Sequence, residues 1–214
     1  RLLVEASPLN STSCTWSPTY TETQPASIYT AANPQTLILY NKTRLDHVYG
    51  VTRGNEISNA LVALADLPGV QGKVVPVDVD LGVSDAYTSW NANYCSIWHA
   101  NQVADAIRDD VISPALAAHP TISYVVLVGG DEQIPFRRTP DQTVIANERY
   151  YAAGTEAGWG ALRAALDQGY LLTDDFYGTP PGGGLLARGR VLWLPDLAVG
   201  RLVETPGEIE GLID

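Results

Sequence analysis

Cys95 and His99 are the residues best suited to nucleophilic chemistry, because a thiol and an imidazole stand four positions apart. On a helix this spacing places both side chains on one face, within reach of a thiolate–imidazolium pair. The only other cysteine is Cys14. A Cys14–Cys95 disulfide would remove the nucleophile and, through the entropy of the unfolded chain, would contribute about 4 to 5 kcal/mol of stability. The sequence leaves both possibilities open.

Paired carboxylates offer a second kind of chemistry. Asp174 and Asp175 precede the residues FYG in an expected loop, and carboxylate and backbone oxygens are the ligands that Ca²⁺ prefers. An arginine such as Arg149 or Arg201 could instead pair with one of the aspartates and leave the other in solvent. The sequence therefore predicts that this loop is ordered either by Ca²⁺ or by an arginine.

Acidic residues also follow two expected strands. Asp131 and Glu132 come after a Gly-Gly pair at the end of an apolar run, where open α/β sheets place their sites. They either contribute to a site or accept backbone N–H groups at the turn. Asp78, Asp80 and Asp85 form a second acidic loop, which lacks the register of an EF-hand. Phosphate binding is disfavoured, because the chain contains no G-x-G-x-x-G or G-K-[ST] motif.

Alternating strands and helices would position these residues. Apolar runs without alternation indicate strands buried on both faces, at 35–41, 73–79 and 124–128. Apolar residues at helical spacing indicate helices at 55–67 and 101–117. We expect a loop at 44–50 and a polar, aromatic loop at 80–94. Two βαβ units of this kind predict an α/β fold, a three-layer sandwich with a mainly parallel sheet.

The rest of the chain carries weaker patterns. A short helix is expected at 161–168, and strands are expected at 190–194 and 197–202. Thr205 and Glu208 have the spacing of a capping box and predict that a helix begins there. This helix ends after about two turns, and the chain contains no methionine. We therefore expect the chain to be part of a longer polypeptide.

Charge and hydropathy exclude some partners. The chain has 214 residues and a formal net charge of −11, whereas nucleic acid and anionic membranes require clustered lysine and arginine. No run of 18 apolar residues is present, so no membrane span is expected. An acidic chain could instead bind Ca²⁺ through carboxylate-rich loops.

Four segments together resemble a known family. They are VGGDEQIPF at 128–136, ANERYYA at 146–152, TDDFYG at 173–178, and LPDLAVGRL at 194–202 with its capped helix. Over about residues 34–214 the chain is similar to the gingipain-like cysteine peptidases, which are clan relatives of the caspases. The resemblance implies two caspase-like halves, of which only the second carries a His-Gly motif and a cysteine nucleophile. No histidine follows His119 and no cysteine follows Cys95, so neither family catalytic residue can be matched here.

The resemblance divides the chain into an extended lead-in (1–33), a non-catalytic caspase-like subdomain (34–190) and the start of the catalytic half (191–214). It implies an extracellular or cell-surface cysteine endopeptidase that acts on peptides or proteins, in which this chain supports the catalytic half. The partner would be the remainder of the polypeptide or another chain. The alternative is a non-enzymatic interaction module that retains the fold. If the C-terminal strand and helix belong to a second half-domain, an exposed apolar patch is expected, formed by Val199, Leu202, Ile209 and Leu212, whereas burial of these residues would favour the module.

Overall fold

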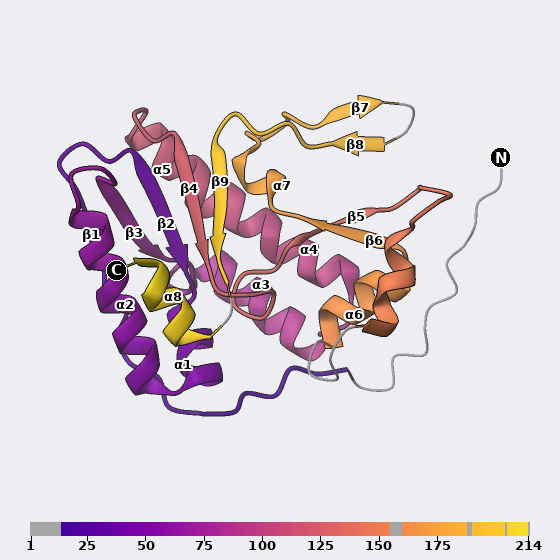
Figure 1. Ribbon diagram of the computed structural model, residues 1–214, viewed down its shortest axis with the longest axis horizontal. Coiled ribbons are helices and arrows are strands. Elements are labelled where there is room, and N and C mark those ends of the chain that lie inside the picture. The colour runs from indigo at the N-terminus through magenta and orange to yellow at the C-terminus, as the bar shows by residue number, and fades with distance from the viewer. Residues whose placement is uncertain (1–13, 155–159, 188–189, 204, 214) are drawn as a thin grey trace.

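The computed structural model describes residues 14–154, 160–187, 190–203 and 205–213, and it has an α/β fold (Figure 1). Its centre is a five-stranded sheet in the order β1-β3-β2-β4-β9. These strands are β1 (Tyr29–Thr30), β2 (Thr36–Tyr40), β3 (Gly72–Pro76), β4 (Tyr124–Val128) and β9 (Ala198–Leu202). All neighbouring strands are parallel except β1, which is antiparallel to β3. The direction of strand addition reverses between β2 and β4, which makes their carboxyl ends the topological switch point.

Helices cover both faces of this sheet (Figure 1). One face carries α1 (Lys42–Tyr49), α2 (Val51–Asp66) and α8 (Pro206–Ile213). The other face carries α3 (Leu81–Ala92), α4 (Ile97–Ala106), a π-helical stretch (Ile107–Ile112) and α5 (Ser113–Ala118).

Alternate side chains of β2 show why both faces are covered. Leu37 and Leu39 belong to the core cluster beneath α3, α4 and α5. Ile38 and Tyr40 belong to the cluster beneath α1, α2 and α8. All four side chains are fully buried. The predicted α/β class with a mainly parallel sheet is therefore confirmed.

Two expected loops are helices instead. The 44–50 segment lies in α1, which begins after Asn41 because the Asn41 side chain accepts a hydrogen bond from the Arg44 amide at 2.8 Å. The 80–94 segment contains α3, which Asp80 caps by accepting from the Val83 amide at 3.1 Å. Both predictions were wrong because a capping side chain and the packing of a few apolar residues outweigh a polar composition.

The C-terminal residues join the same sheet and the same core. β9 pairs in parallel with β4, and Ile209 of α8 is fully buried in the cluster that contains β2 and α2. The predicted capping box is present, since the Glu208 carboxylate accepts from the Thr205 amide at 2.9 Å. Of the expected apolar patch, Leu212 is exposed and Ile209 is not, so this part of the patch prediction was wrong.

Two small antiparallel sheets of two strands each extend from one end of the sandwich (Figure 1). β5 (Arg137–Pro140) pairs with β6 (Tyr170–Thr173), and β7 (Leu185–Ala187) pairs with β8 (Arg190–Leu192). The short helices α6 (Gly160–Asp167) and α7 (Asp175–Gly178) lie before and after β6. No helix among the described residues is long and apolar enough to cross a membrane.

Candidate functional site

Arg201 of β9 lies at the centre of a buried cluster at the carboxyl end of β4. Its guanidinium donates two hydrogen bonds to the Asp174 carboxylate, from Nε at 2.8 Å and from Nη2 at 2.6 Å. Its Nη1 donates to the carbonyl oxygens of Gly129 and Ile134, at 2.9 and 2.8 Å. Phe136 covers one face of the guanidinium, with 4.1 Å between Cζ and the ring centre. One side chain therefore ties three segments, 128–136, 173–178 and 194–202, into a single unit.

Neighbouring contacts lock the 128–136 segment further. Tyr177 donates its hydroxyl to the Pro135 carbonyl at 2.5 Å, and the Phe136 amide donates to Asp131 Oδ1 at 3.0 Å. Asp131 Oδ2 accepts from Arg138 Nη2 at 2.6 Å, and both of these side chains are buried. Asp131 is thus a structural ion-pair partner that turns the chain after β4.

The charge of Arg201 is maintained inside the protein. Burial alone would lower the pKa of its guanidinium, but the hydrogen bond and the charge of Asp174 outweigh burial and raise the pKa. The side chain is only 5% exposed. Because removal of one partner would leave the other charge buried and unpaired, the pair holds the three segments in one arrangement.

The 173–178 segment is not the expected loop, because Asp175–Gly178 form α7, and an arginine holds the residue that precedes this helix. Both Asp174 oxygens accept from Arg201, whereas Asp175 is exposed and its amide donates to Thr173 Oγ1 at 3.1 Å. Among the described residues no group of three or more His, Cys, Asp or Glu side chains is arranged to hold a metal ion. A Ca²⁺ ion at this loop would have to compete with the Arg201 guanidinium for Asp174.

The Cys95–His99 pair cannot act as a nucleophile in this structure. Cys95 is joined to Cys14 in a disulfide, with 5.6 Å between the two Cα atoms. His99 lies in the first turn of α4, and its Nδ1 is 2.8 Å from Oγ of the N-cap residue Ser96. The chain has only two cysteines, so no free thiol remains. Of the two possibilities that the sequence left open for Cys95, the structure has the disulfide.

The remaining acidic candidates serve local structure. Asp78 accepts from the amides of Lys42 and Thr43, at 3.0 and 2.9 Å, and so caps the start of α1. Asp80 caps α3, and Asp85 of α3 is exposed. Glu132 is half-buried, and burial raises the pKa of its carboxyl group above the ordinary value. Asp78, Asp80 and Asp85 therefore do not lie together in one acidic loop, because Asp78 and Asp80 cap different helices and Asp85 lies within α3.

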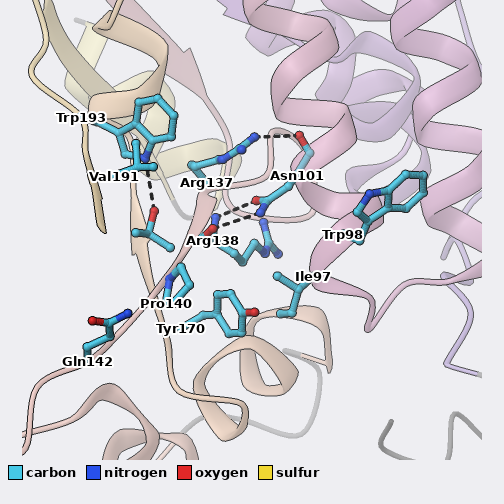
Figure 2. Close-up of a pocket in the computed structure, with 11 residues that line it drawn as sticks. Ile97, Trp98, Asn101, Arg137, Arg138, Pro140, Gln142, Tyr170, Val191 and Trp193 are labelled. Atoms are coloured by element: carbon cyan, nitrogen blue, oxygen red, sulfur yellow. Dashed lines mark hydrogen bonds between the residues drawn. The ribbon is translucent and has the colours of Figure 1, made fainter. Parts of the chain in front are cut away.

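A groove of about 430 Å³ lies between α4 and the two small sheets, β5–β6 and β7–β8 (Figure 2). Trp98 of α4 and Trp193, which follows β8, stand on opposite sides of Arg137 and Arg138 in this view. The groove is lined by Ile97, Trp98, Asn101, Arg137, Arg138, Thr139, Pro140, Gln142, Tyr170, Val191 and Trp193.

Polar groups fix the wall of this groove. The Asn101 side chain donates from Nδ2 to the Arg138 backbone carbonyl at 3.0 Å, and its Oδ1 accepts from the Arg138 backbone N–H at 2.9 Å. Asn101 therefore pairs with the outer edge of β5. Arg137 donates to Asp105 at 2.6 Å and packs over the rings of Phe176 and Trp193. Both arginines are thus already paired, and the groove offers a mainly apolar surface to a ligand, which includes the rings of Trp98, Tyr170 and Trp193.

Arg44 is a buried cation that sequence reasoning missed, because it was assigned to a loop. Its guanidinium lies 4.2 Å from the ring centre of Trp16, 4.6 Å from Tyr87 and 4.9 Å from Trp90. It donates to the Glu132 carbonyl and to Asn91 Oδ1, and within the described part of the chain it has no ion-pair partner. Burial lowers the pKa of Arg44. The signal available in the sequence was the helical spacing of Tyr87, Trp90 and Tyr94, but nothing in the sequence connected these residues to Arg44 or Trp16.

No protein-family model, curated protein or solved structure matches this chain.

Proposed function

We propose that this chain is the non-catalytic, caspase-like part of a gingipain-like cysteine endopeptidase and that it supports the part that carries the catalytic residues. The observation that carries the proposal is the Arg201 cluster. Three of the four segments on which the family resemblance rests are far apart in sequence, yet Arg201 in 194–202 contacts both 128–136 and 173–178. The proposal takes this shared cluster as the structural unit that supports the catalytic part.

The disulfide-bonded state of the two cysteines favours a non-catalytic role for this chain. A cysteine peptidase needs a thiolate, and both thiols of this chain are consumed by the Cys14–Cys95 disulfide. Disulfides persist in oxidising environments, which favours the proposed extracellular or cell-surface location. Substrates of the parent enzyme would be peptides or proteins, and the partner of this chain would be the rest of the polypeptide or another chain.

A non-enzymatic interaction module is the second candidate, and the groove between α4 and the two small sheets favours it. Its aromatic lining and its volume of about 430 Å³ fall in the range of binding sites for small ligands or peptide segments. In this alternative the fold is retained for binding alone.

Expression of the complete natural polypeptide separates the two candidates. We expect it to cleave a broad peptide library in the presence of reductant, and we expect iodoacetamide to abolish the cleavage. An Arg201→Met change should lower that cleavage, whereas the surface change Arg163→Met should not. A complete polypeptide with no thiol-dependent cleavage would favour the interaction module.

A further inference from the structure

Residues 14–27, which we call the strap, run past the carboxyl end of the sheet. In Figure 1 they form the indigo segment along the bottom of the view, below the ends of the parallel strands. The strap is joined to the start of α4 by the Cys14–Cys95 disulfide and leads into β1 at the far edge. In open α/β sheets this side of the sheet is where ligands bind, and here it is covered by the protein's own chain.

The strap is held largely through its backbone, as an extended peptide ligand would be. The Cys14 carbonyl accepts from the Tyr94 amide at 2.8 Å, and the Trp16 amide donates to the Asn91 carbonyl at 2.9 Å. Further along, the amides of Tyr20 and Gln24 donate to the His47 carbonyl at 2.9 Å and to Asp46 Oδ2 at 2.8 Å. The Ser27 carbonyl accepts from the Tyr40 hydroxyl at 2.6 Å. Main-chain contacts of this kind give affinity without demanding a particular side chain.

Trp16 supplies the side-chain specificity. Its indole covers the Arg44 guanidinium at 4.2 Å and lies 5.6 Å from the His47 ring. The other two rings around Arg44, Tyr87 and Trp90, belong to α3 and are buried. Over the residues that the structure describes, the buried Arg44 guanidinium has no carboxylate partner and is stabilised by three aromatic faces, one of which comes from the strap. The site therefore selects a flat aromatic side chain.

Unfilled space lies on both sides of Trp16. One cavity of about 140 Å³ is bounded by Trp16, Arg44, His47 and Asp78. A second cavity of about 260 Å³ is bounded by residues 14–19, Tyr94 and Glu132. The strap thus occupies this surface without filling it, which leaves room for the larger side chains of another peptide.

We propose that the surface formed by α1, the end of α3 and Tyr94 is a binding site for an extended polypeptide with an aromatic side chain, and that the strap occupies it in cis while the Cys14–Cys95 disulfide is intact. This site shares no lining residue with the groove between α4 and the two small sheets. The proposal is independent of the peptidase assignment because it uses no catalytic step.

Occupation of this site by the strap depends on the redox state of the Cys14–Cys95 disulfide. Both cysteines are only half-buried, and Cys14 lines the larger cavity, so a reductant has access. A dithiol would transfer two electrons and two protons, break the S–S bond, leave thiols at Cys14 and Cys95, and itself become a disulfide. The strap would then be fixed at one end only, and a peptide in trans would compete with a lower effective concentration of the cis segment.

The test uses a fluorescein-labelled peptide with the sequence of residues 15–27, TWSPTYTETQPAS. The receptor is the full chain with Cys14→Ser, Cys95→Ser and Trp16→Ala, and its folding is checked by circular dichroism. Fluorescence anisotropy should give a Kd at least tenfold lower for this receptor than for the oxidised wild-type chain. The peptide with Trp16→Ala should bind the receptor at least tenfold more weakly. Trp98→Ala in the receptor, which removes an exposed tryptophan of the other groove, should leave binding unchanged.

Two results would overturn the proposal: equal binding of the two peptides to the open receptor, or equal binding of the first peptide to the oxidised wild-type chain. If the triple variant does not fold, the wild-type chain reduced with dithiothreitol takes its place. Hydrogen exchange then provides the second readout. Reduction should accelerate exchange at the amides of Trp16, Tyr20, Gln24 and Tyr94 and leave β2 protected, and unchanged exchange at those four amides would contradict the proposal.

Discussion

Arg201 and Asp174 are 27 positions apart in sequence and are joined by two parallel hydrogen bonds, at 2.8 and 2.6 Å, inside the protein. The same guanidinium holds two carbonyl groups of the turn after β4. Arginine suits this position because its planar group can bind a carboxylate with two nitrogens and still donate from the third. The pair fixes where the edge strand, the turn and α7 meet.

Replacement of Arg201 should lower the free energy of unfolding substantially. Arg201→Met leaves the Asp174 carboxylate and the carbonyls of Gly129 and Ile134 without their donor, so we expect unfolding to require about 3 to 5 kcal/mol less. The matched control is Arg163→Met, because Arg163 and Asp167 form an ion pair whose side chains are 48% and 51% exposed. That change should cost less than about 1 kcal/mol. Urea denaturation of the two variants measures the difference, and similar costs would contradict the role of the buried pair.

Substitutions of the two aspartates in the 173–178 segment should differ in their effect on stability. Asp174→Asn weakens the pairing with Arg201, whereas Asp175 is exposed and Asp175→Asn should change stability by less than about 0.5 kcal/mol. Because Arg201 already occupies both Asp174 oxygens, we expect excess Ca²⁺ or EDTA to leave the Tm of the wild-type chain unchanged. A reproducible rise in Tm with Ca²⁺, lost in both asparagine variants, would instead assign a calcium site to this loop.

Helix α8 should contribute to the stability of the domain through one residue. Ile209 is fully buried, so Ile209→Ala should cost about 2 to 4 kcal/mol. Leu212 of the same helix is 67% exposed, and Leu212→Ala should be nearly neutral. Thermal unfolding of the two variants measures both effects. Equal, small costs would mean that α8 does not pack on this sheet in solution.

Glu132 should make stability depend on pH. Burial raises the pKa of its carboxyl group in the folded protein above the ordinary value of 4.5. Between the unfolded and the folded pKa the native state binds more protons, so this group lowers stability as the pH rises through that window. Glu132→Gln should therefore gain stability relative to the wild-type chain at pH 7 and not at pH 4. Parallel melting curves of the two proteins at both pH values test this sign.

Patterns of buried apolar residues predicted the sheet well. The strand 124–128 was placed at its observed bounds, and the helix expected at 161–168 is α6, one residue earlier. Such segments are determined by burial, which a run of valine and leucine records directly. Helix α1 was missed because its buried face includes Lys42 and Asp46, which form an ion pair with each other. Helix α3 was missed because only Val83, Tyr87 and Trp90 are buried in an otherwise polar segment.

The site was harder to predict because it depends on contacts between distant residues. The sequence named Arg201 as one of two arginines that could pair with the aspartates, and it named Asp174, but it gave no indication that the turn after β4 binds the same guanidinium. Arg44 was missed for a similar reason, since its three aromatic neighbours come from positions 16, 87 and 90. Residue types suggest which pairs are possible, and only the fold brings them together.

Hydrolysis of a broad peptide library by this chain alone, with reductant and with or without Ca²⁺, tests the central claim most directly. We expect no cleavage above background, because no histidine follows His119 and no cysteine follows Cys95, so the catalytic residues of the proposed family are not matched in this chain. The reductant frees the Cys95 thiol from its disulfide with Cys14, so the assay also tests Cys95 and His99 directly. The result that would contradict this account is cleavage that is lost in both Cys95→Ala and His99→Ala and retained in Cys14→Ala, since it would make Cys95 and His99 a catalytic pair.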